Sequence, residues 1–562
     1  MTDTTADTNP SASLRHSDAD FDVIIVGAGF SGMYMLHKVR SLGLSVRSFE
    51  RGSGVGGTWF WNSYPGARVD THSIVYSYGF DDDLQQEWEW SETYAAQPEL
   101  LRYANHVADR YDLRRDIQFE TTVTAATFDD AAGIWRVTLD NGNSVSARYY
   151  IMASGILSIP KRIDVPGLDS FRGELYFTNN WPKDKEIDLA GKRVGVVGTG
   201  SSGIQVVQTI AGIVDQLYVF QRTPNFAVPM RNAPTDPERA AAVKANYPAF
   251  RAATRQKSDG QFADHFPINE SIYSVTPEQR EAEFEKRWQV GGFNILSTFN
   301  DLFSDPVANE FLCEFFRKKL KETVHDPRTA ELLTPHGHTI GSRRLMVEMG
   351  YYEAFNRDNV HLVDLRSEAI TEVTPTGLST EMNDYDLDVL IFATGFDGET
   401  GPLLAVDIKG TGGQSLREKW TGFPKSYLGV ATSGFPNMFI MVGPGSPAVL
   451  TNVIVTLEYH AEWIANLIAY METNGIERVD PKKDAEDKWA EFVIAEADKT
   501  IFPRDTGSGW IGANIPGKPR YIKVYVGGLH SYITIADDVA ARGYQEFDQM
   551  SIETVTAAAR SR

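Results

Sequence analysis

The sequence has very little cysteine, fewer basic than acidic residues, and no long apolar run. Cys313 is the single cysteine in 562 residues, which excludes an internal disulfide, a cysteine-pair redox centre and a multi-cysteine metal cluster. The formal net charge of −21 argues against a general attraction to nucleic acid or to an anionic membrane. No stretch reaches the roughly 18 apolar residues of a membrane span. The N-terminus lacks the apolar core of a signal peptide. We therefore expect a cytoplasmic protein whose partners are small molecules, not nucleic acid or membrane.

The first recognisable unit is a strand, a glycine-rich turn and a helix. After Asp22, residues 23–26 are apolar and β-branched, as in a buried parallel strand, and the turn is Gly27-Ala-Gly29-Phe30-Ser31-Gly32. Such a turn lets a pyrophosphate approach the backbone and the N-terminus of the following helix. Glu50 ends the next expected strand and is suited to bind both hydroxyls of a ribose. This pattern predicts a dinucleotide without a 2′-phosphate; the alternative is a glycine turn without a ligand.

A second copy of the unit differs at the position of the ribose-binding acid. Its turn is Gly198-Thr199-Gly200-Ser201-Ser202-Gly203. Glu50 lies 23 residues after Gly27, and Gln221 lies 23 residues after Gly198. Arg222 and Thr223 follow at once, and a guanidinium and a hydroxyl suit a 2′-phosphate. We therefore expect NADP as the second ligand, although Arg222 as a solvated charge at a strand end is the alternative.

The segment between the second unit and residue 335 changes to a helical character. Four capping residues there each precede a proline at a first helical position, and these pairs are Asp236-Pro237, Thr276-Pro277, Asp305-Pro306 and Asp326-Pro327. Strand-like patterns resume at residues 359–363 and 387–392. We expect an α/β protein with two Rossmann-like dinucleotide-binding domains, the second of them for NADP, and an inserted helical domain.

These patterns give a complete set of expected boundaries. Residues 1–20 are expected to form a disordered tail and 551–562 a C-terminal tail. The first dinucleotide-binding domain, which the resemblance described below assigns to FAD, is expected at 21–157 and 390–550. The NADP-binding domain is expected at 158–224 and 336–389, and the helical insertion at 225–335.

Two different dinucleotide sites imply electron transfer between a flavin and a nicotinamide. Disulfide reductases have this layout but need a redox cysteine pair, which one cysteine cannot supply. Oxygen, a quinone and another acceptor all remain open on these residues alone.

Two further segments resemble type I Baeyer–Villiger monooxygenases. Residues 171–182 are similar to the family pattern FxGxxxHxxxW[PD]. Residues 56–70, which run from Gly56 to Asp70, match the pattern [AG]GxWxxxx[FY]P[GM]xxxD at every fixed position. With Ala393-Thr-Gly395 and residues 443–447, the similarity extends from about residue 21 to 547 and is nearest to the phenylacetone and steroid monooxygenase group.

The resemblance implies an enzyme with FAD that uses NADPH and O2. Through a C4a-peroxyflavin it would convert hydrophobic aryl, cyclic or steroid-like ketones into esters or lactones. It also implies that Arg344 is the catalytic cation and that Asp70 is the acid that orients it. A monomer or weak dimer is expected.

Further site residues follow from the motifs and the resemblance together. Besides the first glycine turn and Glu50, the FAD residues are Gly57, Thr58, Trp59, Asp70, Tyr76 and Val123. Besides the second glycine turn, the NADP residues are Arg222, Thr223, Arg343, Arg344 and, with less support, Trp510. The substrate pocket is expected at Pro447, Ala448, Val449, Leu450 and Val453. No metal site is expected, because His336 and His338 have no third ligand at useful spacing.

Two departures from the family pattern keep alternatives open. Phe177 stands where the family has histidine, which removes a hydrogen-bonding group at the junction of the nucleotide domains. Trp510 lies one position later than the family tryptophan. The alternatives are a monooxygenase for sulfur or nitrogen, an uncoupled NADPH oxidase, and a flavin-bound regulatory protein without turnover.

Overall fold

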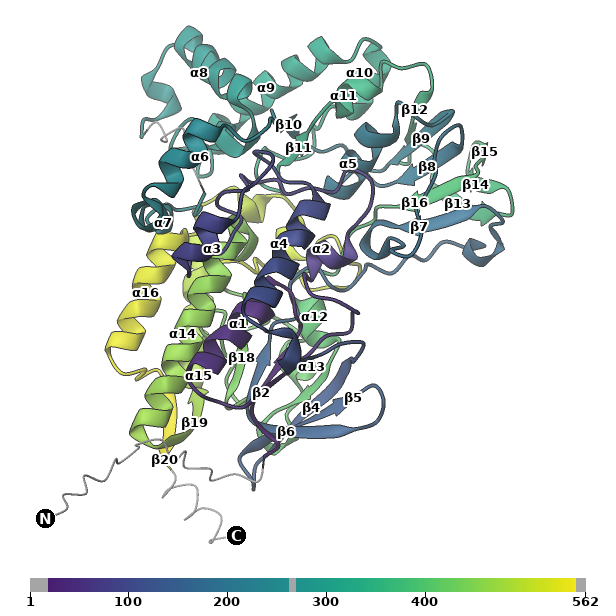
Figure 1. Ribbon diagram of the computed structural model, residues 1–562. Coiled ribbons are helices and arrows are strands. Elements are labelled where there is room, and N and C mark those ends of the chain that lie inside the picture. The colour runs from purple at the N-terminus through teal and green to yellow at the C-terminus, as the bar shows by residue number, and fades with distance from the viewer. Residues whose placement is uncertain (1–18, 262–268, 552–562) are drawn as a thin grey trace, which may run out of the picture.

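The computed structural model describes residues 19–261 and 269–551, and its first sheet forms the lower part of Figure 1. This eight-stranded sheet has the order β17-β4-β5-β6-β1-β2-β3, with β18 paired to β6. Its strands are β1 (Phe21–Val26), β2 (Val46–Phe49), β3 (Ile117–Gln118), β4 (Val123–Asp129), β5 (Ile134–Leu139), β6 (Ser144–Met152), β17 (Asp407–Lys409) and β18 (Met438–Ile440). Val23, Ile24 and Ile25 of β1 are fully buried between two parallel neighbours, as the apolar run predicts.

Helices from both ends of the chain cover this sheet. Helix α1 (Phe30–Ser41) packs beside α14 (Val453–Asn474), so the C-terminal region returns to the first sheet. The other helices of this half are α2 (Thr58–Trp61), α3 (Asp82–Glu87), α4 (Gln97–Arg110), α12 (Thr400–Leu404), α13 (Leu416–Lys419), α15 (Lys483–Asp498) and α16 (Leu529–Ala541). A two-stranded antiparallel sheet of β19 (Ile476–Pro481) and β20 (Phe547–Ser551) completes it.

The second sheet lies at the upper right of Figure 1 and is parallel throughout, in the order β12-β9-β8-β16-β7. Its strands are β7 (Glu174–Phe177), β8 (Arg193–Val197), β9 (Gln216–Gln221), β12 (Val360–Asp364) and β16 (Val389–Phe392), and α5 (Ser201–Ile210) follows β8. A small antiparallel sheet of β13 (Ile370–Thr374), β14 (Gly377–Thr380) and β15 (Asp384–Asp386) adjoins it. The expected boundary at residue 390 falls inside β16, whose pairing with β7 and β8 puts it in the second sheet.

The helical segment lies at the top of Figure 1. All four expected helix starts are confirmed, because each capping side chain accepts a hydrogen bond from the first turn of its helix. The helices are α6 (Pro237–Lys244), α7 (Tyr247–Arg255), α8 (Pro277–Val290), α9 (Pro306–Thr323), α10 (Pro327–Leu333) and α11 (Tyr351–Ala354). Strand β10 (Ala227–Pro229) pairs with β11 (Met346–Glu348) beneath them. Cys313 is buried in α9.

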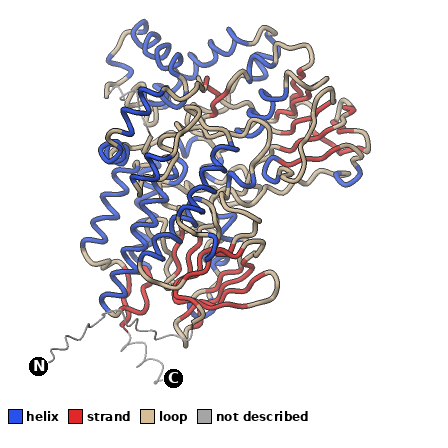
Figure 2. The backbone as a smooth tube through the Cα atoms, in the orientation of Figure 1, coloured by secondary structure: helices blue, strands red, loops and turns tan. Residues whose placement is uncertain are grey.

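Short 3₁₀ turns connect these elements, and the loops between them are shown in Figure 2. They are η1 (Arg114–Asp116), η2 (Leu168–Ser170), η3 (Thr178–Asn180), η4 (Ile272–Ser274), η5 (Gly292–Ser297), η6 (Thr411–Gly413), η7 (Ala448–Leu450), η8 (Phe502–Arg504) and η9 (Gly509–Ile511).

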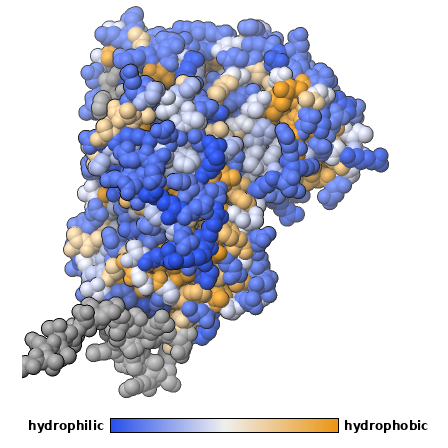
Figure 3. All heavy atoms as spheres, in the orientation of Figure 1, coloured by the Kyte–Doolittle hydropathy of each residue, from blue (hydrophilic) through white to orange (hydrophobic). Residues whose placement is uncertain are grey.

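The expected tails differ from the structure at their inner ends. Asp20 exchanges hydrogen bonds with Ser146 of β6, and Ser551 ends β20, so both residues belong to the folded part. The rest of the expected tails, apart from residue 19, lies outside the described residues. Within the described ranges, no helix combines the length and apolar character needed to cross a bilayer. The face in Figure 3 is largely hydrophilic, with apolar atoms in separate small patches.

Candidate functional site

The first glycine turn is a close-packed cradle at the C-terminal end of β1. Gly27 has φ +106°, and a Cβ there would lie 2.6 Å from the carbonyl oxygen of Ala153. A Cβ on Gly32 would lie 1.9 Å from the carbonyl oxygen of Gly27. A Cβ on Gly29 would lie 3.3 Å from Cα of Gly57, so the two family motifs meet backbone to backbone. Only glycine fits the first two positions, as the sequence pattern predicts.

Glu50 lies at the end of β2 beside this turn and is 6% exposed. Its Oε2 accepts a hydrogen bond of 2.8 Å from the amide of Ala28, and its Oε1 accepts one of 2.8 Å from the amide of Gly52. These bonds fix the carboxylate, and each oxygen retains a second lone pair for a ribose hydroxyl. Phe30 and Ser31 begin α1, and Thr58 begins α2.

The second glycine turn repeats the geometry of the first at the end of β8. Gly198 has φ +112°, and a Cβ there would lie 2.5 Å from the carbonyl oxygen of Ala393. A Cβ on Gly203 would lie 2.0 Å from the carbonyl oxygen of Gly198. A Cβ on Gly200 would meet no described atom within 4 Å, so there is open space beside the backbone at the start of α5. Thr199 donates a hydrogen bond of 3.2 Å to the carbonyl of Thr223.

Arg222 follows β9 at this edge, and its neighbour Lys161 was not predicted from the sequence. Lys161 donates its backbone N–H to Gly395 over 3.0 Å, directly after β16. Burial lowers the pKa of Lys161, and the nearby charge of Arg222 lowers it further. Neither side chain has an ion pair among the described residues. Two cations therefore lie near each other beside the glycine turn, an arrangement that suits an anion.

Arg343 is held by a residue that the sequence pattern did not reveal. Its Nε and Nη2 donate to Asp505 over 2.6 and 2.9 Å, and Asp505 is 6% exposed. Asp505 also accepts hydrogen bonds from Ser342 and the amide of Gly507. Burial alone would raise the pKa of Asp505, but its bonds with Arg343 and these donors hold that pKa below its ordinary value. Arg343 is thus tied to the C-terminal loop.

Arg344 and Asp70 form a two-pronged ion pair between the two nucleotide-binding halves. Nη2 of Arg344 lies 2.7 Å from both carboxylate oxygens of Asp70, and Nε lies 3.1 Å from Oδ2. The residues are 274 positions apart. Phe293 of the helical segment lies beneath the guanidinium, 4.9 Å from its carbon to the ring centroid. Both side chains remain partly exposed, at 32% and 26%, so a ligand can reach them.

The predicted flavin residues Trp59 and Tyr76 lie beside this pair. Nε1 of Trp59 donates a hydrogen bond of 3.1 Å to the hydroxyl of Tyr76. Burial raises the pKa of Tyr76 to about 12, and the charges of Asp70 and Arg344 also act on it. Val123 does not join this group, because it is buried in the apolar core at the start of β4.

The second family motif also joins the two halves directly. The hydroxyl of Tyr64 donates a hydrogen bond of 2.8 Å to Oε1 of Gln205 on α5. Nε2 of Gln205 donates to the carbonyl of Arg68 over 3.1 Å, two residues before Asp70. The position of Asp70 is therefore set from the second dinucleotide-binding half.

The expected substrate loop begins at Pro447 and leads into α14, which starts at Val453. Ala448 is 1% exposed and has φ +43°, a strained value for a residue with a Cβ. Asn452 caps α14 and donates to the carbonyl of Val75 over 2.6 Å. The loop is thus fixed next to the segment that carries Tyr76. Leu450 is partly buried, and the side chain of Val449 is outside the described atoms.

Trp510 lies in the loop that follows Asp505. Ser508 donates a hydrogen bond of 2.8 Å to the carbonyl of Ser342, which places this loop alongside the Arg343–Arg344 segment. Nε1 of Trp510 is buried and has no hydrogen-bond partner among the described residues. Such a donor is costly to leave unpaired and fits a bound ligand.

Phe177 lies at the C-terminal end of β7 and is paired in register with Phe392 of β16. The two rings stack with centroids 5.7 Å apart and an interplanar angle of 17°. An apolar contact therefore occupies the position of the family histidine.

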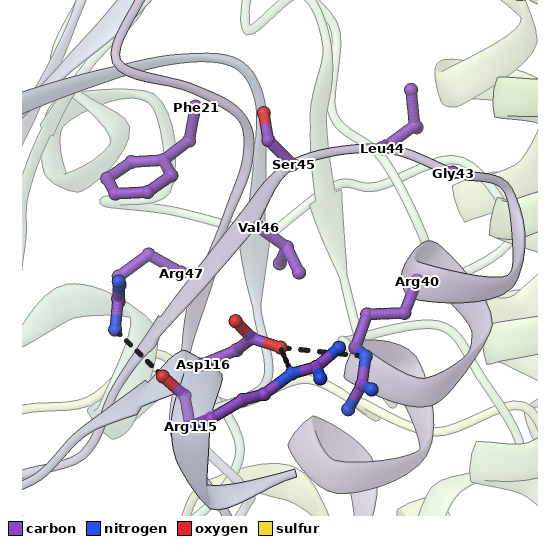
Figure 4. Close-up of a pocket in the computed structure, with 9 residues that line it drawn as sticks. All are labelled: Phe21, Arg40, Gly43, Leu44, Ser45, Val46, Arg47, Arg115 and Asp116. Carbon is purple, nitrogen blue, oxygen red and sulfur yellow. Dashed lines mark hydrogen bonds and ion pairs between the residues drawn. The ribbon is translucent and has the colours of Figure 1, made fainter. Parts of the chain in front are cut away.

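A surface pocket of about 370 Å³, shown in Figure 4, contains none of the predicted site residues. It is lined by residues such as Phe21 and Val46, which begin β1 and β2, and by Arg40, Arg47 and Arg115. The glycine turns follow the opposite ends of the strands, so this pocket does not belong to the dinucleotide sites.

Comparisons with known proteins agree with these features. Residues 21–232 match the model of the flavin-binding monooxygenase-like family. The chain is 41% identical over 532 residues to a Baeyer–Villiger monooxygenase of Pseudooceanicola batsensis, covering 94% of this chain and 96% of that protein. It is 40% identical over 539 residues to phenazine N-monooxygenase PhzNO1 of Lysobacter antibioticus, covering 95% and 98%.

A solved structure extends the similarity to the whole fold. The structure of oxidized steroid monooxygenase bound to NADP superposes with a TM-score of 0.90 at 45% identity, covering 94% of this chain and 99% of that one. Both family motifs, the two glycine cradles and the Asp70–Arg344 pair occur together in a chain with this degree of similarity. The chain therefore belongs to the flavin-dependent Baeyer–Villiger monooxygenases.

Proposed function

We propose that the chain holds FAD, uses NADPH and O2, and inserts one oxygen atom beside the carbonyl of a ketone to give an ester or lactone. The ion pair of Arg344 with Asp70, between the two glycine cradles, carries this proposal. Gly27 and Glu50 fit the pyrophosphate and adenosine ribose of FAD, and Gly200 fits the pyrophosphate of the coenzyme. Reduced flavin, when bound, supplies the electrons that activate O2.

Arg344 supplies a fixed positive charge where negative charge develops on oxygen. A guanidinium stays protonated at any working pH and presents several donors in one plane. Asp70 holds two of its nitrogens, and the ring of Phe293 supports its face, so little reorganisation is needed during the reaction. We assign the guanidinium of Arg344 to the reacting oxygen.

We assign the 2′-phosphate of NADPH to Arg222, Thr223 and Lys161. The two cations flank the second glycine turn without an ion pair among the described residues, which supports this assignment. Arg343 is one of the NADP residues expected from the sequence, but two of its nitrogens already bind Asp505, so we propose a smaller contribution from it to phosphate binding.

We propose hydrophobic aryl, cyclic or steroid-like ketones as substrates. The apolar loop of Pro447, Ala448 and Leu450 beside the Tyr76 segment supports a hydrophobic pocket. The steroid monooxygenase among the similar structures is consistent with a large ketone. The cytoplasm and a monomer or weak dimer remain predictions from the sequence.

The test is one turnover reaction with the FAD-loaded protein, NADPH, ¹⁸O₂ and phenylacetone. We expect benzyl acetate with one ¹⁸O atom, detected by mass spectrometry. Consumption of NADPH with peroxide and no ester, for phenylacetone and for a panel of cyclic and steroid ketones, would contradict the proposal.

Nitrogen or sulfur oxidation is the second candidate, because a phenazine N-monooxygenase is 40% identical to this chain. The uncoupled NADPH oxidase remains a further alternative because of Phe177. A parallel reaction with phenazine and with thioanisole separates these activities. N-oxide or sulfoxide without any ester from the ketone panel would favour heteroatom oxidation, and peroxide alone would favour the oxidase.

A further inference from the structure

Gln205 is a buried polar residue on α5, the helix that begins in the second glycine turn, and it is 4% exposed. Its Oε1 accepts the hydrogen bond of 2.8 Å from Tyr64, and its Nε2 donates over 3.1 Å to the carbonyl of Arg68. Because a carbonyl only accepts, the amide of Gln205 makes both bonds in one orientation only. Gln205 therefore holds two points of the segment that leads to Asp70.

Gly66 brings the same segment against the backbone of α5. It has φ +79°, and a Cβ there would lie 2.6 Å from the carbonyl oxygen of Gln205. That carbonyl also accepts a hydrogen bond of 2.6 Å from the hydroxyl of Thr209. Only glycine allows so close an approach in this backbone conformation. Every second residue of the segment 64–68 therefore contacts α5.

The first dinucleotide-binding half holds the other side of this segment. The amide of Val69 donates over 3.1 Å to the carbonyl of Ala95, and the carbonyl of Ala67 accepts over 2.8 Å from the amide of Gln97. Asp70 follows directly. Because no free length of chain separates these bonds from Asp70, the contacts with α5 set where its carboxylate lies.

The same helix also contacts the segment that carries Arg344. Strand β11 begins two residues later, at Met346, and packs beside α5 (Figure 1). The hydroxyl of Ser201, the first residue of α5, donates over 2.8 Å to Sδ of Met346. Oε1 of Gln208 accepts a hydrogen bond of 2.7 Å from the amide of Met349, directly after β11. The Arg344 segment is therefore also supported from α5.

One helix thus supports both members of the Asp70–Arg344 pair. Positions 201, 205 and 208 of α5 are four and three residues apart, which places their side chains along one face of the helix. The pair has a two-pronged geometry, with Nη2 of Arg344 2.7 Å from both carboxylate oxygens, and such a geometry is sensitive to small displacements. Its alignment therefore depends on α5.

We propose that Gln205 is a positioning residue, which ties the Asp70–Arg344 pair to the helix that binds the coenzyme. The inference rests on the proposed function, because that function places the coenzyme pyrophosphate at the start of α5 and the reacting oxygen at Arg344. Coenzyme bound there orders α5, and the two hydrogen bonds of Gln205 extend this order to the segment before Asp70.

The test uses the FAD-loaded protein and the variant Gln205→Met, which fills a similar volume but makes neither hydrogen bond. Asn437→Gly is the matched control. Asn437 is also a buried amide, which donates to the carbonyl of Glu477 and accepts from the amide of Val479, and its φ of +55° suits glycine. FAD content and thermal unfolding check that the variants fold. Tyr64→Phe, which removes one of the two bonds, is the second, gentler variant.

One arm of the test measures amide hydrogen exchange by mass spectrometry, with and without NADP⁺ and without turnover. In wild type and Asn437→Gly, we expect NADP⁺ to slow exchange in residues 64–72 about tenfold, the effect of one ordinary hydrogen bond. In Gln205→Met this slowing is lost, and in Tyr64→Phe it is reduced, while NADP⁺ still slows exchange at residues 198–205. Slowing of residues 64–72 that persists in Gln205→Met would overturn the inference.

The other arm measures ester formation in Gln205→Met, Asp70→Asn and the double variant, with a ketone that wild type converts. We expect Gln205→Met to lower kcat about tenfold and to change the KM for NADPH by less than about twofold. In the Asp70→Asn background it should cause no further loss, because it acts through Asp70. Additive losses, or an unchanged kcat in Gln205→Met, would contradict the positioning role.

Failure of the proposed function would appear differently. It would be a wild-type protein that forms no ester from any ketone, while the exchange arm still reports whether Gln205 links coenzyme binding to the segment before Asp70.

Discussion

Asp505 binds Arg343 through two hydrogen bonds of 2.6 and 2.9 Å, although the two residues are 162 positions apart. The neighbouring arginine, Arg344, binds Asp70. Two adjacent arginines therefore join different parts of the chain, since one holds the C-terminal loop and the other faces the first dinucleotide half.

Asp505→Asn should loosen the loop that carries Trp510. The change leaves Arg343 without its carboxylate, and breaking one side of a buried pair costs about 3 kcal/mol. We expect faster amide hydrogen exchange in residues 505–525 by mass spectrometry. Asp487→Asn, which removes a carboxylate from a more exposed ion pair, is the control. Equal exchange in both variants and wild type would contradict a holding role for Asp505.

Arg344→Ala should separate flavin reduction from ester formation. Loss of a fixed donor at a developing oxyanion costs about 10²- to 10³-fold in rate. We expect retained FAD, bleaching of the flavin by NADPH under anaerobic conditions, and ester formation reduced by at least that factor. Arg136→Ala, which removes an exposed arginine that pairs with Asp129 on the first sheet, is the control. Ester formation at the wild-type rate would refute the role of Arg344.

Arg222→Ala and Lys161→Ala should each weaken the binding of NADPH much more than the binding of NADH. Each removes one cation from a phosphate that NADH lacks, which we expect to raise the KM for NADPH about tenfold. Steady-state kinetics with both coenzymes measures the difference. Arg162→Ala, an exposed neighbour of Lys161, is the control. Equal losses with NADPH and NADH would argue against a phosphate contact.

Local sequence patterns predicted the helix starts and glycine turns because their causes lie within a few residues. Asp236 and Thr276 cap the helices that begin at the next proline. The positive φ of Gly27 and Gly198 follows from a tight turn before a helix.

Long-range pairs were not predictable in the same way. Asp505 carries no local pattern, and only the folded chain places it against Arg343. Lys161 lies near Arg222 because its backbone N–H donates a hydrogen bond to the carbonyl of Gly395, which follows β16. The expected boundary at 390 was wrong for a related reason, because an apolar run such as β16 suits either sheet and only pairing decides between them.

Phe177→His should improve coupling of NADPH consumption to product. Phe177 stacks on Phe392 and offers no hydrogen bond at the end of β7, whereas an imidazole restores a donor and an acceptor there. We expect less hydrogen peroxide and more ester per NADPH. Phe177→Leu, which loses the stack without adding a polar group, is the control. The same peroxide yield in wild type and both variants would show that this position does not affect coupling.

His460 should make the folded state less stable in mild acid. It is fully buried on α14, its Nδ1 accepts from the amide of Val442, and its Nε2 bonds the hydroxyl of Tyr532. Burial lowers its pKa from 6.5 to about 3. Below pH 6.5 the imidazole of His460 therefore binds a proton in the unfolded chain but stays neutral in the folded chain. The free energy of unfolding falls as the pH falls toward 3, by about 1.4 kcal/mol per pH unit.

The measurement is urea unfolding of wild type and His460→Asn at pH 7 and pH 5. Asparagine can accept from Val442 but does not titrate, so the stability advantage of wild type over the variant should shrink by about 2 kcal/mol between these pH values. Glu348 and Glu458, whose pKa values burial raises to about 7, give a slope of the opposite sign. They are present in both proteins, so their effect cancels in the difference. The exposed His325→Asn is the control, and an advantage that is the same at both pH values would disprove the assignment to His460.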